Sequence, residues 1–291
     1  MTKIAFIGLG AMGLPMAENL RKAGHDVSGY DLSDKARAAF QARGGHVAGS
    51  AREAAHDTEL LVLMVVNADQ AEDVLFTQRT AEALAPDGIV ILGATCAPAR
   101  AEQIAVKLEA MQRGMVDAPV SGGVGGAKSG TLTIMASAPD RTYARAEPYL
   151  KTLGSKLVRV GDRAGQGAMV KTINQLLCGV HIAVAAEAMA LAEKSGLDTQ
   201  LLLKIYGESA AASWMLNNRG PRMISDNPEV ASAVDIFVKD LGIVLDAGRA
   251  AKAPLLLSAV AHQLFVAASG MGLGRADDSQ VIEAYRVLSP S

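Results

Sequence analysis

Up to about residue 160, short apolar runs alternate with amphipathic stretches along the chain. The runs are nearly continuous in aliphatic residues, which is typical of parallel strands buried on both faces and separated by helices. The expected strands are Ile4–Ile7, Asp26–Tyr30, Glu59–Val66, Gly88–Leu92, Met115–Val120, Leu132–Ala136 and Lys156–Val160. The pattern predicts a doubly wound α/β domain.

The pattern changes after Gly165, where strand-like runs give way to helical periodicity up to the C-terminus. Two glycines bracket a charged turn at 161–165, so we place the domain boundary there. We expect an α/β domain over residues 1–163 and an all-helical domain over residues 164–291. The helical domain is expected to carry substrate and subunit contacts.

One helix, expected over Gly167–Lys194, is apolar on most sides and therefore predicted to be buried. Lys171, Asn174, Gln175 and Cys178 follow the spacing i, i+3, i+4, i+7, which gathers them on an arc of roughly 100°. Because buried polar groups need partners, this stripe indicates a ligand cleft. The alternative is that Lys171 reaches solvent and Asn174 bonds to the backbone.

A glycine motif follows the first expected strand directly. Gly8-Leu9-Gly10-Ala11-Met12-Gly13 stands between that strand and a helical stretch, and Asp31 ends the second strand about 20 residues on. This order places a pyrophosphate on a helix N-terminus and lets a carboxylate bind the adenosine ribose. It predicts a Rossmann domain that binds NAD, the alternative being a glycine-rich turn without a ligand.

Composition narrows the class further. The formal net charge is -2 with no long basic run, so nucleic acid is not an expected partner. No uninterrupted run of ~20 strongly apolar residues occurs, which argues against a membrane span, and no Cys/His cluster has metal-ligand spacing. Cys96 and Cys178 are expected to be small packing residues in a reducing compartment. We expect a cytoplasmic protein that holds no metal and contacts no membrane.

These motifs together resemble the β-hydroxyacid dehydrogenase family, which includes 3-hydroxyisobutyrate dehydrogenase and tartronate semialdehyde reductase. The resemblance covers essentially the whole chain in the family's order. It is carried by the segments at 8–20, 117–123 (Asp-Ala-Pro-Val-Ser-Gly-Gly), 165–175 (Gly-Gln-Gly-Ala-Met-Val-Lys-Thr-Ile-Asn-Gln) and 239–242 (Lys-Asp-Leu-Gly).

The resemblance implies a role for each matched position. Lys171 is the expected acid/base, which takes the alcohol proton during oxidation. The expected substrate-binding residues are Ser121, Gly122, Gly123, Asn174 and Gln175, where the glycine amides and the serine hydroxyl suit a carboxylate and Asn174 donates to a substrate oxygen. The remaining cofactor contacts are expected at Val66, Asn67, Thr95 and Lys239. Lys239 has an alternative role, as a surface lysine paired with Asp235.

Two positions depart from the family's usual residues. Gly93-Ala94-Thr95 stands where Asp-Ser-Thr is common, and Asn174-Gln175 stands where paired asparagines are common. Segments at 65–68, 174–183 and 232–240 are similar to the branch acting on four-carbon acid sugars. The expected reaction is therefore NAD-dependent oxidation of L-threonate at C2 to the 2-keto acid by a homo-oligomer, dimer or tetramer.

Three other functions stay open on the sequence alone. The first is 3-hydroxyisobutyrate or tartronate semialdehyde chemistry on the same scaffold. The second is imine reduction, although the related imine reductases usually lack the lysine that Lys171 retains. The third is a non-catalytic NAD-binding protein. His181 is a candidate substrate contact, with ordinary burial as the alternative. Trp214 is expected to pack in the helical core, with covering the cleft as the alternative.

Overall fold

The computed structural model describes residues 1–288 of the 291-residue chain. It divides into two compact units, Met1–Lys171 and Thr172–Ser291. This division falls later than the boundary predicted after residue 163, because the first turn of the long helix belongs to the first unit. Ala168 in that turn packs into a core cluster of the α/β unit.

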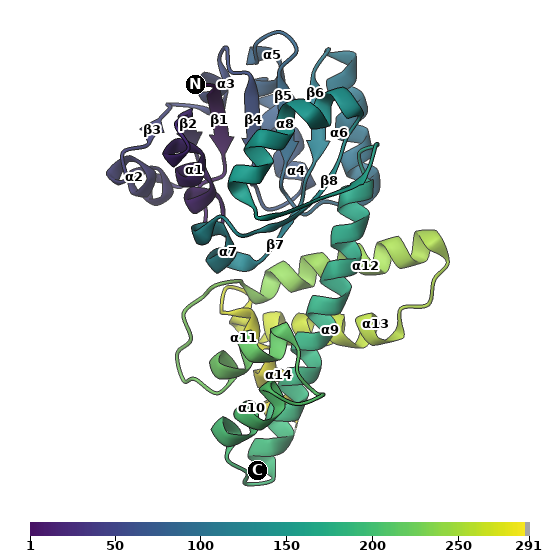
Figure 1. The fold of residues 1–291 in the computed structure, drawn as a ribbon. Helices are drawn as coiled ribbons and strands as arrows, with labels where there is room; N and C mark the ends of the chain where they lie inside the picture. The colour runs from purple at the N-terminus through teal and green to yellow at the C-terminus, as the bar shows by residue number, and fades with distance from the viewer. Residues whose placement is uncertain (289–291) are drawn as a thin grey trace. The chain divides into compact units, whose positions relative to one another are not determined.

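The first unit is built on one nine-stranded sheet in the order β3-β2-β1-β4-β5-β6-β8-β7, with β9 paired to β8 (Figure 1). The strands are β1 (Lys3–Ile7), β2 (Asp26–Tyr30), β3 (His46–Val47), β4 (Leu60–Leu63), β5 (Ile89–Leu92), β6 (Gly114–Asp117), β7 (Val120–Ser121), β8 (Thr133–Ser137) and β9 (Lys156–Gly161). The first six pair in parallel in the order 3-2-1-4-5-6, which is the Rossmann arrangement. The predicted fold class is confirmed.

Alternate side chains of the central strands enter two cores. Ile4 and Phe6 of β1 point into one cluster, and Ala5 and Ile7 point into the other. Both faces are therefore buried, as the continuous apolar runs predicted. The helices of this unit are α1 (Gly13–Lys22), α2 (Asp34–Ala42), α3 (Ala51–Ala55), α4 (Ala68–Glu72), α5 (Thr80–Ala83), α6 (Pro98–Ala110), α7 (Gly123–Ser129) and α8 (Asp140–Leu153), with a π-helical turn at Asp73–Thr77.

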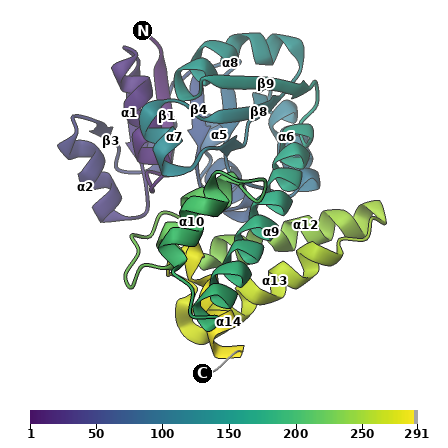
Figure 2. The same cartoon turned by 60° about the horizontal axis from the view of Figure 1, so that its bottom comes forward.

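The predicted strands differ from the structure in three respects beyond one-residue shifts at their ends. The strand expected over Met115–Val120 is broken into β6 and β7, because Pro119 lacks the N–H that a continuing ladder needs. The strand expected over Glu59–Val66 ends at Leu63, where the chain enters the loop before α4. The two-residue β3 was not predicted. Strands β8 and β9 lie side by side in parallel, as Figure 2 shows.

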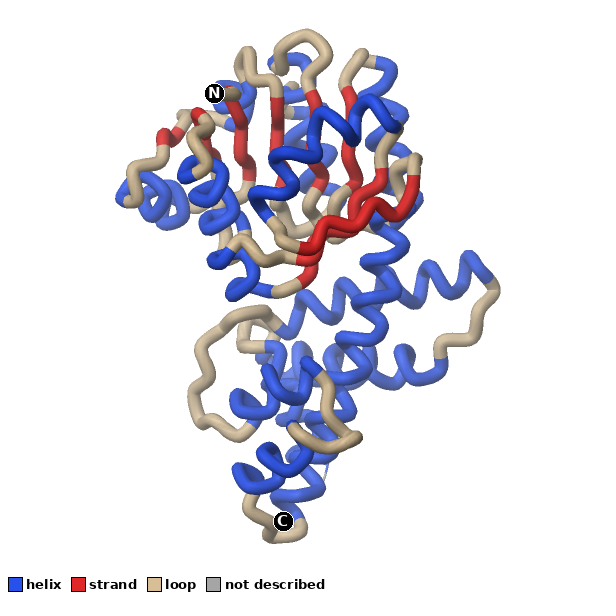
Figure 3. The backbone as a smooth tube through the Cα atoms, in the orientation of Figure 1, coloured by secondary structure: helices blue, strands red, loops and turns tan. Residues whose placement is uncertain are grey.

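The second unit is helical (Figure 3). Among its described residues the only β pairing is one isolated bridge between Ala233 and Asp277. Its helices are α9 (Gln166–Lys194, which begins in the first unit), α10 (Thr199–Gly207), α11 (Trp214–Met223), α12 (Val234–Ala251), α13 (Leu256–Ala268) and α14 (Ile282–Leu288), with short turns at Ser269–Leu273 and Asp278–Val281. Its core gathers buried apolar residues of α9, α12 and α13.

Candidate active site

The glycine loop joins β1 to α1 in a conformation that only glycine can adopt. Gly8 has φ +96, and a Cβ placed there would lie 2.5 Å from the Met64 carbonyl oxygen. A Cβ on Gly13 would lie 1.8 Å from the Gly8 carbonyl oxygen, so the helix could not approach the strand. Gly10 differs, because its Cβ would meet nothing within 4 Å. The open side of Gly10 is where the backbone can approach a pyrophosphate.

The carboxylate of Asp31 is held beside this loop. Its Oδ2 accepts from the Leu9 N–H at 2.7 Å, and its Oδ1 accepts from the Ser33 N–H at 2.8 Å. Arg37 of α2 donates to the Asp31 carbonyl oxygen at 2.5 Å and also pairs with Asp34. Arg37 had no role in the sequence analysis, and the structure places it beside Asp31 from the helix that follows.

The carboxyl ends of four parallel strands meet at one edge of the sheet. Ile7 pairs with Leu63, Leu63 with Leu92, and Leu92 with Asp117. The loops that follow these strands therefore emerge together, at the edge where open α/β sheets bind ligands. They carry most of the predicted cofactor residues: Gly8, Leu9, Gly10, Ala11, Met12, Gly13, Val66, Asn67 and Thr95.

Two internal hydrogen bonds hold the loop after β4. Asn67 caps α4, accepting from the Gln70 N–H at 2.9 Å, while the Gln70 side chain accepts from the Val66 N–H at 2.9 Å. This reciprocal pair fixes the course of the loop. Val66 keeps 49% of its surface exposed, and Thr95 after β5 is half-buried.

The predicted carboxylate loop begins at β7 and continues into α7. Gly122 and Gly123 have φ of +130 and +61, and both are exposed. A Cβ on Gly123 would meet nothing within 4 Å, so the backbone here is open to a ligand. Asn19 of α1 donates to the Ala127 carbonyl oxygen at 2.8 Å, which ties this loop's helix to the helix after the glycine loop.

Asp117 joins the end of the sheet to the start of the long helix. Its side chain is buried, and its Oδ2 accepts from the N–H groups of Gly165 at 2.9 Å and Ala168 at 2.8 Å. Ser137 extends this cap, because its Oγ accepts from the Gly167 N–H at 2.9 Å. The carboxylate therefore fixes the first turn of α9, the helix that carries Lys171. The sequence analysis assigned Asp117 no role of its own. An acidic residue at the end of a buried strand does indicate that its carboxylate has hydrogen-bond donors nearby.

Burial raises the pKa of Asp117 to about 6. Hydrogen bonds from Ala168, Gly165 and Ser137 lower this pKa, but burial has the larger effect. The folded pKa then exceeds the unfolded value of 3.8. In this case the folded state binds more protons between these pH values, so stability falls as pH rises. Relative to Asp117→Asn, we expect the wild type to lose on the order of 2 kcal/mol between about pH 4 and pH 6. Urea unfolding of both proteins across this range measures the difference, and a difference that rises with pH would contradict the assignment.

Lys171 begins a polar arc on α9. It is 7% exposed, Gln175 one turn further on is also 7% exposed, and Asn174 and Cys178 are half-buried. The predicted stripe therefore lies on one helix face, with two of its members buried. The predicted roles of Lys171, Asn174 and Gln175 stay predictions.

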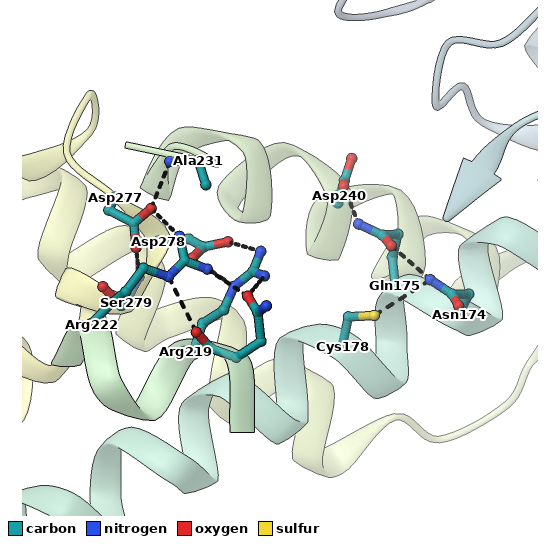
Figure 4. Close-up of polar contacts among 11 residues, drawn as sticks. Asn174, Gln175, Cys178, Arg219, Arg222, Ala231, Asp240, Asp277, Asp278 and Ser279 are labelled. Carbon is teal, nitrogen blue, oxygen red and sulfur yellow. Dashed lines mark hydrogen bonds and ion pairs between the residues drawn. The ribbon is translucent and has the colours of Figure 1, made fainter. Parts of the chain in front are cut away.

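The arc is connected to α12 by hydrogen bonds, shown in Figure 4. Asn174 Nδ2 donates to Gln175 Oε1 at 2.9 Å and to Cys178 Sγ at 3.4 Å. Gln175 Nε2 donates to Asp240 Oδ2 at 2.5 Å. Lys239 Nζ lies 2.6 Å from Asp240 Oδ1. Asp235, the alternative partner of Lys239, accepts from Ser269 Oγ at 2.6 Å, and both roles considered for Lys239 stay predictions.

Two family models cover nearly all of the chain. The model of the NAD binding domain of 6-phosphogluconate dehydrogenase matches residues 3–161. The model described as NAD-binding of NADP-dependent 3-hydroxyisobutyrate dehydrogenase matches residues 165–285. The chain belongs to the 3-hydroxyisobutyrate dehydrogenase family.

Individual relatives of this family extend the match over the full length. The L-threonate dehydrogenase of Cupriavidus necator is 45% identical, covering 97% of this chain and 95% of its own. The 3-hydroxyisobutyrate dehydrogenase of Pseudomonas aeruginosa is 37% identical, covering 91% of each. A crystal structure described as 3-hydroxyisobutyrate dehydrogenase from Salmonella typhimurium superimposes with a TM-score of 0.92 at 40% identity, covering 96% of this chain and 98% of its own. The predicted family is confirmed, and the chain is an NAD-dependent oxidoreductase.

Two further side chains singled out in the sequence lie elsewhere in the helical unit of this dehydrogenase. His181 lines a cavity of about 420 Å³ whose other walls include Val184, Leu202 and Tyr206. The expectation that Trp214 packs in the core is wrong: it is 56% exposed, and the Arg219 guanidinium lies 5.7 Å from its ring centroid. Cys96 is buried and Cys178 is half-buried.

Two helices of the described residues are long and apolar enough to cross a membrane by length and composition alone. They are α9 and the stretch Leu256–Leu273, with mean hydropathies of 1.6 and 1.5. Core helices of soluble proteins pass the same test, and α9 contributes Ile182, Ala186 and Met189 to the core of the helical unit. Within residues 1–288 no group of three or more His, Cys, Asp or Glu side chains is arranged to hold a metal ion.

Proposed function

We propose that this enzyme oxidises L-threonate at C2 and produces the corresponding 2-keto acid. The observation that carries the proposal is the polar network that continues from Asn174 through Gln175 to Asp240, one turn beyond Lys171. An apolar or branched acid would leave part of such a network unpaired, whereas the hydroxyls of a four-carbon sugar acid can bind to it. The 45% identity to the L-threonate dehydrogenase of Cupriavidus necator supports the same substrate.

The residues of this chain then divide the chemistry among them. The open amides at Gly122 and Gly123, with the Ser121 hydroxyl, suit the substrate carboxylate. Lys171, as a neutral amine, accepts the proton of the C2 hydroxyl at Nζ and returns it in the reverse direction. When bound, NAD supplies the acceptor for the hydride that leaves C2. The Asp117 cap contributes by fixing the first turn of α9, which precedes the turn that carries Lys171.

Substrate choice follows from the same network. One unpaired buried polar group costs about 1–3 kcal/mol, so we expect kcat/KM for L-threonate to exceed that for 3-hydroxyisobutyrate by about 10-fold or more. Steady-state rates with NAD on L-threonate, D-threonate, D-glycerate and 3-hydroxyisobutyrate measure this. If 3-hydroxyisobutyrate or D-glycerate has the highest kcat/KM, the result favours 3-hydroxyisobutyrate or tartronate semialdehyde chemistry instead. The 37% identity to a 3-hydroxyisobutyrate dehydrogenase supports this second candidate.

Cofactor choice depends on the side chains around the expected ribose site. The Asp31 carboxylate repels a 2′-phosphate, and Arg37 is already paired with Asp34. We expect NAD to be preferred over NADP by at least about 10-fold in kcat/KM, because a like-charge clash exceeds ~1.4 kcal/mol in a partly closed site. Asp31→Ser should raise activity with NADP, and adding Arg37→Ala should remove that gain. Equal wild-type efficiency with both cofactors would contradict the assignment.

We also propose a homo-oligomer, dimer or tetramer. Ile173, Leu177, Val184 and Leu191 of α9 are 54%, 51%, 54% and 67% exposed. At 100° per residue they lie within an arc of ~40°, a narrow apolar stripe suited to packing against another helix. A mass of 30.1 kDa in solution would contradict this proposal. Cytoplasmic localisation and the absence of nucleic acid and membrane partners stay predictions.

A further inference from the structure

The direction of the hydrogen bonds from Asp240 to Asn174 is fixed by charge. A carboxylate only accepts: Asp240 Oδ2 accepts from Gln175 at 2.5 Å, while Oδ1 forms an ion pair with the Lys239 ammonium at 2.6 Å without a hydrogen bond of good geometry. Asp240 is 2% exposed, so water does not screen this contact. If the Gln175 amide were reversed, its Oε1 would face Oδ2 with no hydrogen between the two acceptors. Gln175 must therefore present its NH₂ group to Asp240.

The same constraint passes to the next side chain. With its NH₂ group on Asp240, Gln175 presents Oε1 to Asn174 at 2.9 Å, so Asn174 must donate there. The second Nδ2 hydrogen of Asn174 is directed at Cys178 Sγ, 3.4 Å away. Both donors of this amide are used inside the chain. What Asn174 offers to a ligand is its carbonyl oxygen, which only accepts.

We infer that the carbonyl oxygen of Asn174 accepts a hydrogen bond from a substrate hydroxyl, and that Asp240 orients this amide through Gln175. Asn174 therefore selects substrates that carry a second hydroxyl in addition to the one oxidised. This differs from the sequence expectation, in which Asn174 donated to a substrate oxygen. A carboxylate or keto oxygen facing Asn174 would bring two acceptors together, whereas a hydroxyl supplies the hydrogen. The C2 hydroxyl gives its hydrogen to Lys171, so Asn174 binds a hydroxyl on C3 or C4. The inference rests on the proposed function and narrows it.

Deoxy analogues of the substrate test this without any variant. We expect kcat/KM of the wild type with NAD to fall by about 10-fold or more when one of the C3 or C4 hydroxyls of L-threonate is replaced by hydrogen. The other deoxy analogue should lose less of its kcat/KM. The analogue with the larger loss identifies the hydroxyl that Asn174 binds. Equal efficiency with L-threonate, its 3-deoxy analogue and its 4-deoxy analogue would overturn the inference.

Two variants then assign the effect to the network. Asn174→Leu keeps the shape of the side chain and removes its acceptor, so the preference for L-threonate over the sensitive deoxy analogue should fall to about 2-fold or less. Gln175→Met frees the Asn174 amide to rotate, so the same preference should fall although Asn174 is intact. Gln200→Met, the same change at an exposed site on α10, should leave it unchanged. NAD affinity and melting temperature serve as controls for folding.

The outcomes separate this inference from the proposed function. If Asn174→Leu and Gln175→Met fold and keep the wild-type preference, the inference is wrong even when L-threonate is the substrate. If D-glycerate is oxidised instead of L-threonate, the proposed function fails, and Asn174 is then tested with D-glycerate and 3-hydroxypropanoate, which keeps the C3 hydroxyl oxidised in tartronate semialdehyde chemistry and lacks the C2 hydroxyl. If 3-hydroxyisobutyrate, which has no second hydroxyl, is the preferred substrate, both fail.

Discussion

Replacement of Lys171 by methionine is expected to lower kcat by about 10²–10⁴-fold while NAD affinity stays near the wild-type value. Methionine keeps the length of the side chain and removes the proton acceptor. The lysine is 7% exposed and lies one turn beyond the turn that Asp117 caps, so the start of its helix is held by the sheet. Steady-state kinetics and NAD titration measure the two quantities separately.

A matched control distinguishes lost chemistry from a general effect of losing a lysine. Lys204 on α10 is exposed, and Lys204→Met should leave kcat within about 2-fold of the wild type, because surface substitutions change little. A Lys171→Met protein that retained more than roughly a tenth of wild-type kcat would mean that another group accepts the proton.

The largest expected loss of stability comes from a buried ion pair in the helical unit, on the left of Figure 4. Arg219 Nε and Nη2 bind the two Asp278 carboxylate oxygens at 3.0 Å and 2.8 Å, and the Asp278 side chain has 0% exposure. Asp278→Ala would leave a guanidinium buried without its partner. We expect the free energy of unfolding to fall by about 3–5 kcal/mol, as for other buried pairs broken from one side.

An exposed pair of the same residue types provides the control. Arg249 and Asp246 pair on α12 with side chains 73% and 65% exposed. Asp246→Ala should cost less than about 1 kcal/mol, because solvent screens the pair. Urea unfolding of both variants measures the contrast. Equal losses for the two substitutions would show that burial of Asp278 adds nothing to the stability of the unit.

The α/β unit could be predicted from the sequence because its signals are local. Gly8, Gly13 and Asp31 stand at fixed spacings from two apolar runs, and backbone geometry alone requires these glycines. The long helix was predicted over Gly167–Lys194 and spans Gln166–Lys194, since its composition and length allow no other element.

Contacts between distant segments could not be predicted in this way. The bond between Gln175 and Asp240 joins residues 65 positions apart, and neither residue's local pattern indicates the other. Asp117 was read as part of a motif, but its partners Gly165 and Ala168 lie on another element. Trp214 was expected in the core, yet it lies at the surface with the Arg219 guanidinium beside its ring.

The proposed function requires that a hydride passes from C2 of L-threonate to NAD. An isotope label at C2 follows this transfer directly. L-Threonate carrying deuterium at C2 would be incubated with the enzyme and NAD, and the NADH formed would be analysed by mass spectrometry. We expect NADH that carries one deuterium for each 2-keto acid produced, and we expect the Lys171→Met protein to form labelled NADH far more slowly than the wild type. Unlabelled NADH would place the oxidation at another carbon, and no NADH at all would mean that L-threonate is not the substrate.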